Sequence, residues 1–228
     1  MLYLRPANER GETNFDWLNS KHSFSFGHYY DSKHMGFSAL RVINDDTVAP
    51  GAGFDSHGHR DMEIISYVLE GTIEHKDSMG NSYVIPAGEV QRMSAGTGIK
   101  HSEFNHSQTE RLKFLQIWIQ PNQLGITPSY QQKAIEQAGQ LTPLVTPNGK
   151  DGSLTIHQDV SISRLILEPH QATQLDALNC MAYLHVISGS AIVSGIAISA
   201  GDGVCVQSDQ IIVNTSDQKI TALWLDLP

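Results

Sequence analysis

The stretch Val-Leu-Glu-Gly-Thr-Ile-Glu at residues 68–74 recurs as Val-Ile-Ser-Gly-Ser-Ala-Ile at residues 186–192. Each copy places a glycine turn between two segments with strand-forming residues. A second matching turn follows each copy, Pro-Ala-Gly-Glu at 86–89 and Ser-Ala-Gly-Asp at 199–202. The same order at nearly the same spacing indicates a duplicated β-barrel unit. The alternative is two unrelated β segments with similar turns.

The rest of the chain has the same pattern as this repeat, with short apolar segments between turns. Pro and Gly separate short segments rich in Val, Ile, Tyr, Phe and Leu, which is typical of a sandwich or barrel rather than of alternating βα units. We therefore expect an all-β fold. Strands are predicted in the first half at 39–43, 62–69, 72–75, 82–85, 89–94 and 112–119. In the second half they are predicted at 154–157, 163–167, 182–187, 191–193, 203–206, 211–214 and 222–226.

The composition changes between the two halves. Residues 121–152 contain four prolines with several Gly and Gln, and we interpret them as a connector with one predicted helix at 130–137. The predicted domains are 1–120, which carries the candidate metal ligands, and 153–228. Within the first domain, Asp45-Asp46 is predicted to form a turn.

Length and composition narrow the class of protein. The 228 residues suffice for one large or two smaller β domains, and 40% are hydrophobic. No apolar run approaches the roughly 18 to 20 residues that span a bilayer, and the N-terminus does not read as a secretory signal. Cys180 and Cys205 lie in apolar contexts, which favours buried thiols in a reducing cytoplasm, although a disulfide between them stays open.

The charge balance argues against direct nucleic-acid binding. The formal net charge is −9, and Lys and Arg are scattered along the chain. Affinity for nucleic acid depends on clustered Lys and Arg that neutralise phosphates. We therefore expect a small-molecule ligand rather than nucleic acid or a membrane.

Two short segments carry ligand-type side chains at strand spacing. Because side chains two apart on a strand share a face, His57 with His59, and His101 with Glu103, would present three imidazoles and one carboxylate. Such a set suits Fe, Mn, Ni, Cu or Zn. With 11 histidines in the chain, a lone His-x-His is a weak signal. The alternative is that these histidines are polar residues of a strand that bind no metal.

The second half serves as an internal control. Alignment on the repeated turns places Leu175 and Ala177 opposite the first histidine pair, and Asn214 and Ser216 opposite His101 and Glu103. These side chains cannot rebuild the set, so the C-terminal unit is predicted to lack the metal. The remaining histidines are interpreted as core or surface residues (His157, His170, His185), or as residues that either line the pocket mouth or simply pack (His22, His28, His34).

The surroundings of these residues resemble a known superfamily. The pattern Gly51-x5-His57-x-His59-x3-Glu63, followed by Gly80-x5-Pro86-x-Gly88, is similar to the two motifs of the cupins. Cupins usually place a histidine three residues after Pro-x-Gly, where this chain has Gln91, and Glu63 falls one residue earlier than is common. Together with residues 22–31 and 93–103, this displaced ligand pattern resembles the pirin family over nearly the whole chain, with the closest likeness to bacterial pirin-like quercetin 2,3-dioxygenases.

The resemblance implies two cupin (jelly-roll-like) β-barrel domains in tandem with few short helices. It implies metal ligands at His57, His59, His101 and Glu103, with iron the first expectation and Mn, Ni, Cu, Co or Zn as alternatives. It also implies O2 as co-substrate, a flavonol opened with release of carbon monoxide, and Glu103 as proton acceptor. Glu63 is interpreted as a partner of Arg60 or Arg92 rather than as a ligand.

Two other functions stay open from the sequence. Some pirins are described as regulators that act through a protein partner, so a metal-binding interaction module is the main alternative. A metal-dependent isomerase is the second, because one barrel supports many chemistries. The chain is expected to be monomeric.

Overall fold

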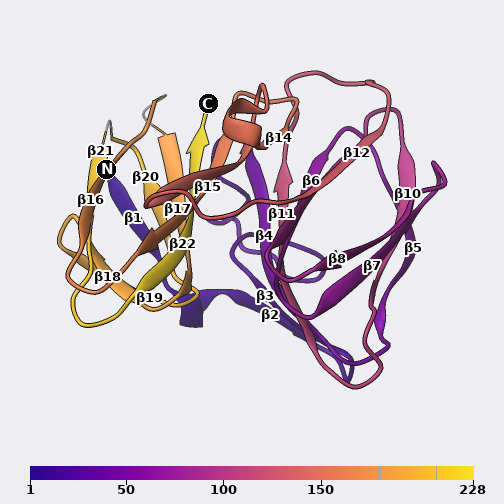
Figure 1. Ribbon diagram of the computed structural model, residues 1–228, viewed down its shortest axis with the longest axis horizontal. Helices are drawn as coiled ribbons and strands as arrows, with labels where there is room; N and C mark the ends of the chain where they lie inside the picture. The colour runs from indigo at the N-terminus through magenta and orange to yellow at the C-terminus, as the bar shows by residue number, and fades with distance from the viewer. Residues whose placement is uncertain (179–180, 209) are drawn as a thin grey trace. The chain divides into compact units, whose positions relative to one another are not determined.

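The computed structural model describes residues 1–178, 181–208 and 210–228, and within these ranges the secondary structure is almost entirely β. Two short 3-10 helices occur in the described part, η1 (Ala7–Glu9) and η2 (Lys150–Gly152). The chain divides into two compact units (Figure 1). Unit 1 comprises Met1–Arg10, Glu136–Ser153 and Asp159–Pro228, and unit 2 comprises Gly11–Ile135 and Leu154–Gln158. The prediction of an all-β fold is confirmed.

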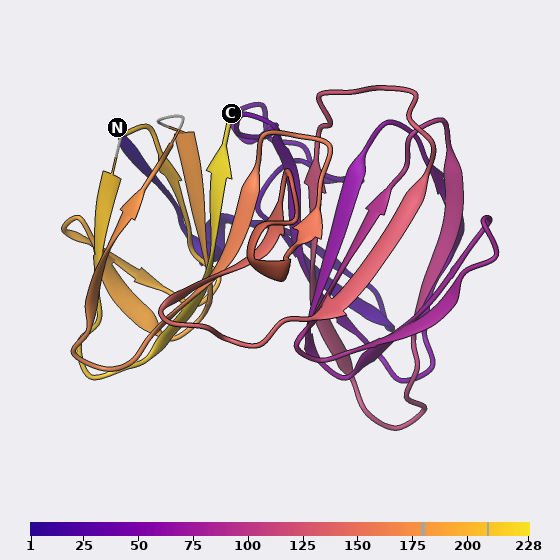
Figure 2. The same ribbon diagram turned by 45° about the horizontal axis from the view of Figure 1, so that its top comes forward.

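Unit 2 consists of two antiparallel sheets (Figure 2). The larger has the order β12-β9-β6-β11-β4-β3-β2 and the smaller the order β5-β10-β7-β8. The strands of the larger sheet are β2 (Gly11–Asn14), β3 (Leu18–His22), β4 (Leu40–Val48), β6 (Glu63–Glu70), β9 (Glu89–Ser94), β11 (Leu112–Ile119) and β12 (Ser129–Ala134). Those of the smaller are β5 (Gly53–His59), β7 (Thr72–Asp77), β8 (Ser82–Pro86) and β10 (Ile99–Asn105). The short β14 (Leu154–Thr155) also belongs to this unit.

Unit 1 repeats this arrangement. Its sheets have the orders β1-β20-β17-β22-β15-β13 and β16-β21-β18-β19. The strands are β1 (Leu2–Arg5), β13 (Leu141–Thr146), β15 (Ser161–Leu167), β16 (Ala172–Asp176), β17 (Met181–Ser188), β18 (Ser190–Val193), β19 (Ile196–Ser199), β20 (Gly203–Val206), β21 (Gln210–Asn214) and β22 (Ile220–Leu227). Each strand from β15 to β22 occupies the place that one of β4 to β11 occupies in unit 2, as the duplication predicts.

The repeated glycines have nearly identical backbone conformations in the two units. Gly71 has φ 78° and Gly189 has φ 79°, both in the left-handed region that favours glycine. A Cβ atom at these positions would come within 2.8 Å and 1.8 Å of a backbone oxygen. At the second turn, Gly88 has φ 88° and Gly201 has φ 86°. The sequence repeat therefore marks turns whose geometry requires glycine.

The interiors of the two units differ in one row of side chains, which we call the polar row. Its members pair in register across five strands of unit 2: His22, Asn44, Gln116, Ser66 and Gln91. Phe114 and Trp118 lie two residues to either side of Gln116 on the same face of β11 and belong to two separate apolar clusters. The polar row thus lies where the core of unit 2 is interrupted.

Unit 1 has apolar residues at the equivalent place. Leu184 corresponds to Ser66 when the repeated glycines are aligned, and it pairs with Trp224 on one side and Val204 on the other. These three residues are buried members of one continuous apolar cluster. Burial of apolar surface alone accounts for this interior, whereas the interior of unit 2 holds polar groups that need partners.

Two local predictions are wrong. Of the segment predicted as a helix at 130–137, residues 130–134 belong to β12, because they pair in register with the otherwise open edge of β9, and residues 135–137 have no regular structure. Asp45 and Asp46 lie within β4 rather than in a turn, because β3 and β11 pair with β4 on both sides of these residues. The boundaries also differ from the predicted ranges, since β1 pairs with β20 and so joins unit 1, and the connector contains β12 and β13.

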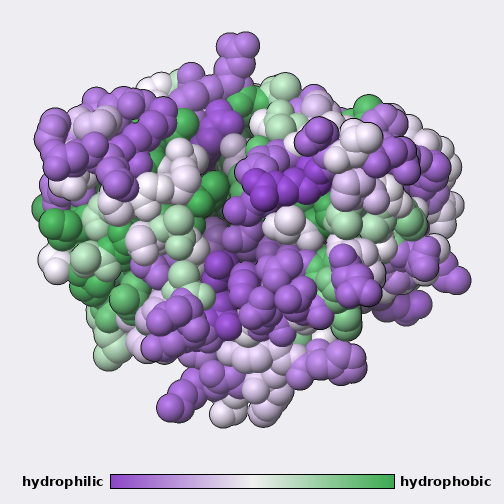
Figure 3. Space-filling model, turned by 90° about the horizontal axis from the view of Figure 1, so that it is seen from below, coloured by the Kyte–Doolittle hydropathy of each residue, from purple (hydrophilic) through white to green (hydrophobic). Residues whose placement is uncertain are grey.

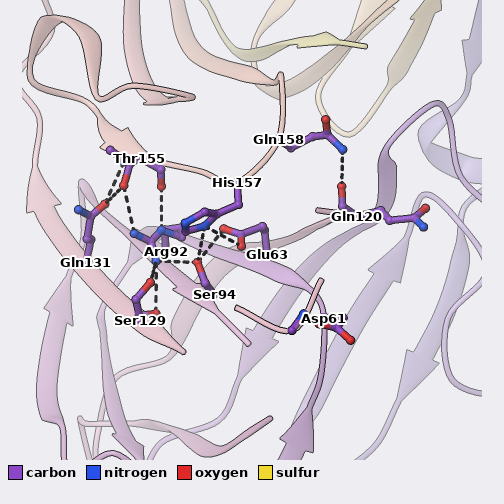
Figure 4. Close-up of polar contacts among 11 residues, drawn as sticks. Asp61, Glu63, Arg92, Ser94, Gln120, Ser129, Gln131, Thr155, His157 and Gln158 are labelled. Atoms are coloured by element: carbon purple, nitrogen blue, oxygen red, sulfur yellow. Dashed lines mark hydrogen bonds and ion pairs between the residues drawn. The ribbon is translucent and has the colours of Figure 1, made fainter. Parts of the chain in front are cut away.

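The segment Leu154–Gln158 is fixed to unit 2 by buried polar contacts (Figure 4). Arg92 donates from Nε to the carbonyl of Thr155 over 2.8 Å and from a terminal nitrogen to Ser94 Oγ over 2.8 Å. Ser94 Oγ donates to Glu63 Oε2 over 2.9 Å, and His157 Nδ1 lies 3.3 Å from Glu63 Oε1. Glu63 therefore has Ser94 and His157 as direct partners, and Arg92 reaches it through Ser94.

The surface is mostly hydrophilic on the face that Figure 3 shows, with hydrophobic residues gathered mainly at the left of that view. Among the described residues, no helix is both long enough and apolar enough to cross a membrane. Cys205 is a free, partly buried thiol, and burial raises its pKa to about 12. Cys180 lies outside the described residues.

Candidate metal centre

Three adjacent strands of the smaller sheet each direct a pair of polar side chains to the same interior. Residues two apart on a strand share a face, and the register places Glu103 opposite His75, and His101 opposite both His57 and Asp77. The three pairs are His57 and His59 on β5, His101 and Glu103 on β10, and His75 and Asp77 on β7.

The three imidazoles of the predicted set converge through their Nε2 atoms. His101 Nε2 lies 3.0 Å from His59 Nε2 and 3.1 Å from His57 Nε2. The carbonyl of Asp55 lies 2.8 Å from His57 Nδ1, which therefore donates its hydrogen there and leaves a lone pair on Nε2. An outer hydrogen bond of this kind is usual for a histidine that binds a metal.

These separations are short enough for one ion to contact all three nitrogens. Nitrogens 3.0 to 3.1 Å apart can each lie about 2.1 Å from the same point, which is the usual length of a bond between a divalent ion and an imidazole nitrogen.

Burial keeps two of these imidazoles uncharged. Burial lowers the pKa of His59 to about 4, and the neighbouring His101 and His57 add to the effect. Burial likewise lowers the pKa of His101 to about 4, with Glu103 opposing. Both rings are therefore neutral at pH 7 and have the unprotonated nitrogens that a metal requires.

Glu103 is a buried carboxylate with both oxygens engaged. Ser66 Oγ donates to Oε1 over 3.1 Å, and Gln116 Nε2 donates to Oε2 over 2.7 Å. Trp118 Nε1 donates to Gln116 Oε1 over 3.2 Å and so fixes the orientation of that amide. Burial raises the pKa of Glu103, but His101, His75 and the two hydrogen bonds outweigh this, and the net pKa lies below its usual value. Ser66 and Gln116 of the polar row therefore hold an ionised Glu103 in place.

The structure groups the four predicted ligands into two overlapping sets. His57, His59 and His101 offer donor atoms that all lie within 4.8 Å of one another. The donor atoms of Glu103, His101 and His75 likewise all lie within 4.8 Å of one another. The prediction missed His75, although it placed a strand at 72–75. The signal was His75-x-Asp77, which has the same two-residue spacing as the other two pairs.

A cavity of about 330 Å³ opens beside these side chains. His57, His59 and Glu103 line it, and so do His22 and His28. Five aromatic side chains form a large part of the remaining wall: Phe15, Trp17, Phe26, Phe54 and Trp118. This volume falls at the lower end of small-molecule sites. Of the three histidines in the N-terminal stretch, His34 is buried and lies 3.8 Å from Asp31 instead.

The wall of the cavity also carries polar groups on β2, β3 and β4. His22 Nδ1 lies 2.8 Å from Asn44 Oδ1, and Thr13 Oγ1 lies 3.0 Å from His22 Nε2. A neutral His22 satisfies both contacts by donating from Nδ1 and accepting at Nε2. Asp46 lines the same wall, and burial raises its pKa to about 7. The cavity thus combines apolar surface with polar groups suited to hydroxyls.

Both candidate metal sets found in the described residues lie in unit 2. In unit 1, Leu175 and Ala177, which alignment places opposite the first histidine pair, are buried in the apolar cluster. His170 is exposed and lies 3.6 Å from Asp217, while His185 is buried. His157, also predicted as core or surface, is half-buried and contacts the buried Glu63.

The chain is similar in sequence to known families and proteins. A family model described as Pirin matches residues 4–119, and one described as the quercetinase C-terminal cupin domain matches residues 143–227. The quercetin 2,3-dioxygenase of Escherichia coli (strain K12) is 48% identical over 229 aligned positions, which cover 100% of this chain and 99% of that protein. A pirin-like protein of Caulobacter vibrioides is 37% identical, with 99% of each chain covered.

Solved structures show the same similarity. The crystal structure of the bacterial pirin YhhW from Escherichia coli, in complex with nickel(II), has a TM-score of 0.96 and 47% sequence identity, and the alignment covers 100% of this chain and 99% of that one. A relative of nearly the same length and fold therefore holds a divalent ion.

Proposed function

The chain belongs to the pirin family, and from this premise we propose that it is a metal-dependent dioxygenase that cleaves flavonols of the quercetin type. The observation that carries the proposal is the convergence of three imidazole nitrogens beside an ionised carboxylate at an aromatic cavity. The relatives named quercetin 2,3-dioxygenase support the choice of substrate class.

The proposed ligands are His57, His59, His101 and Glu103. Three imidazole nitrogens and one carboxylate would suit a borderline or hard divalent ion such as iron, manganese, cobalt or nickel. We propose iron as the native ion, and the nickel complex of YhhW supports nickel as an ion that also fits. Bound there, such an ion would supply Lewis acidity that stabilises the ionised 3-hydroxyl of a flavonol.

The protein's own side chains would then bind and orient the substrate. The aromatic wall packs against planar rings and excludes water from the reacting carbon atoms. The proton of the 3-hydroxyl passes to a carboxylate oxygen of Glu103, which is ionised before substrate arrives. Ser66 and Gln116 hold that carboxylate in position. Overall, one O2 adds, the central ring opens, and carbon monoxide leaves with a depside as the other product.

The polar side of the cavity suits a substrate with several hydroxyl groups. Asp46 has a pKa near 7 and can either donate or accept a hydrogen bond at neutral pH. Thr13, His22 and Asn44 offer further hydrogen-bonding groups beside Asp46. We therefore expect polyhydroxylated flavonols to bind more tightly than flavonols that lack hydroxyls on the outer rings.

The test is aerobic turnover of quercetin by metal-loaded protein, with carbon monoxide and the depside measured directly. His57→Ala and Glu103→Gln are expected to lower kcat/KM by about 100-fold or more. His106→Ala, an exposed histidine whose side chain is 56% accessible, is the matched control and should leave turnover unchanged. Equal turnover in all three variants, or quercetin loss without carbon monoxide, would show that the proposal is wrong.

A further inference from the structure

The buried pair His75 and Asp77 has no part in the proposed reaction, and its surroundings are those of a metal ligand. His75 is 0% exposed, and its ring centroid lies 5.5 Å from that of His101. Donor atoms of His75, His101 and Glu103 all lie within 4.8 Å of one another. We propose that these three residues form a second metal position, the inner position, which shares His101 and Glu103 with the outer position of His57, His59, His101 and Glu103.

Asp77 fixes the tautomer of His75 that can bind an ion. Asp77 Oδ2 lies 3.1 Å from His75 Nε2, so this nitrogen carries the hydrogen and donates it to the carboxylate. Nδ1 of His75 then has a lone pair. Asp77 is itself held by the backbone nitrogens of Met79 and Asn81 and by the Asn81 side chain. A carboxylate that orients a histidine in this way is the usual support of a metal-binding imidazole.

Several polar atoms around this position lack adequate partners. The contact of His75 Nδ1 with Gln91 Nε2 is long, at 3.5 Å. Within the described chain, Gln91 Oε1 and His101 Nδ1 are buried and have no hydrogen-bond partner. A buried polar group without a partner costs free energy, and a bound cation with its remaining ligands would remove part of this cost.

The two positions differ in their access to the cavity. His57 and His59 of the outer position line the cavity, and so does Glu103, whereas His75 and His101 do not line it and are at most 1% exposed. The Tyr130 ring lies over His75 with centroids 4.9 Å apart, and Tyr83 stacks on Tyr130 at 5.0 Å. An ion bound among these buried side chains would stabilise unit 2, because it binds the folded state and not the unfolded chain.

His101 and Glu103 belong to both positions, so the two positions compete for these two residues. An ion at the inner position would draw His101 and Glu103 away from the outer one. The inner position is thus expected to hold an ion most readily when the outer position is disabled. The inference does not depend on dioxygenase activity, because it concerns only where an ion binds.

The experiment disables the outer position and asks whether Ni²⁺ still binds. The variant His57→Ala/His59→Ala is loaded with NiCl2, freed of excess ion, and analysed for nickel content and by anomalous diffraction. We expect a single Ni²⁺ with its anomalous peak among His75, His101 and Glu103. Adding His75→Gln should abolish that binding, and adding Asp77→Asn should weaken it about tenfold or more. Adding His106→Gln is the matched control and should change nothing. Circular dichroism and the melting temperature show that each variant is folded.

The outcomes separate this inference from the proposed function. If wild-type protein binds Ni²⁺ and the folded double variant binds none, or if its binding is indifferent to both His75→Gln and Asp77→Asn, the inner position is rejected and the dioxygenase proposal stands. If the double variant binds Ni²⁺ through His75 while metal-loaded wild type fails to cleave quercetin, the inner position stands and the proposed function fails.

Discussion

Replacing Asp46 by Asn should stabilise the protein, and the gain should grow with pH. Asp46 is 2% exposed, and one of its oxygens, Oδ1, has no hydrogen-bond partner within the described ranges. Burial raises its pKa from 3.8 to about 7, with Glu103 and Asp45 adding and a hydrogen bond from Ser20 opposing. The shift is about three pKa units, at about 1.4 kcal/mol each, so the ionised form costs the native state about 4 kcal/mol.

The sign follows from which state holds the proton more tightly. The folded protein keeps Asp46 protonated to higher pH than the unfolded chain does, so this group lowers stability as the pH rises from about 4 to about 7, and its full cost is present above pH 7. Asn has the same shape and does not ionise. The stability difference between Asp46→Asn and wild type should therefore increase by about 2.5 kcal/mol from pH 5 to pH 8 and change little above pH 8.

The assay is urea unfolding at several pH values in the presence of a chelator, followed by tryptophan fluorescence and circular dichroism together. Asp45→Asn is the matched control, because its side chain is 17% exposed and lies 3.7 Å from Lys113. The difference in free energy of unfolding between Asp45→Asn and wild type should vary with pH by less than about 1 kcal/mol. If the stability difference between Asp46→Asn and wild type is constant or becomes smaller from pH 5 to pH 8, burial does not raise the pKa of Asp46.

Three further predictions concern the site and the turns. Gln116→Leu removes the 2.7 Å hydrogen bond to Glu103 and should lower metal affinity or kcat by about 10- to 100-fold, measured by metal titration and quercetin turnover. The pKa values of His59 and His101 are lowered to about 4, so protons compete only weakly with a metal for their ring nitrogens at pH 5.5. Dialysis at that pH should therefore leave the metal bound, and substantial loss of the metal would contradict this. Gly189→Ala should lower the free energy of unfolding by more than about 1 kcal/mol, because a Cβ there would lie 1.8 Å from a backbone oxygen; an unchanged urea midpoint would contradict the required glycine geometry.

Local sequence was enough to predict the strands that carry the repeat. The strands predicted at 89–94, 112–119 and 203–206 have the bounds found in the structure. Their apolar content and the glycine turns at their ends are properties of neighbouring residues. By contrast, β12 was predicted as a helix, because its polar, unbranched side chains do not show that the edge of β9 lies beside it. Strand formation there depends on a partner about 40 residues away.

The same division holds for the site. The spacing of His57 with His59, and of His101 with Glu103, made these residues recognisable as ligand pairs, because the period of a strand is fixed by its backbone. The sequence could not show that His75 and Asp77 form a third pair facing the same interior, since this depends on the order β5-β10-β7 in the smaller sheet. Nor could it show that Ser66 and Gln116 hold Glu103, because these side chains come from the opposite sheet.

The sequence by itself determined the duplicated all-β architecture and the half of the chain that carries the ligand pairs. Both follow from turn geometry and strand periodicity, which act between near neighbours. The tertiary structure decided which polar groups meet: it placed the polar row beneath Glu103 and grouped Glu103 with His75 as well as with His101. Strand pairing across long separations sets these contacts, and a buried polar side chain takes its pKa and its role from the groups that this pairing places around it.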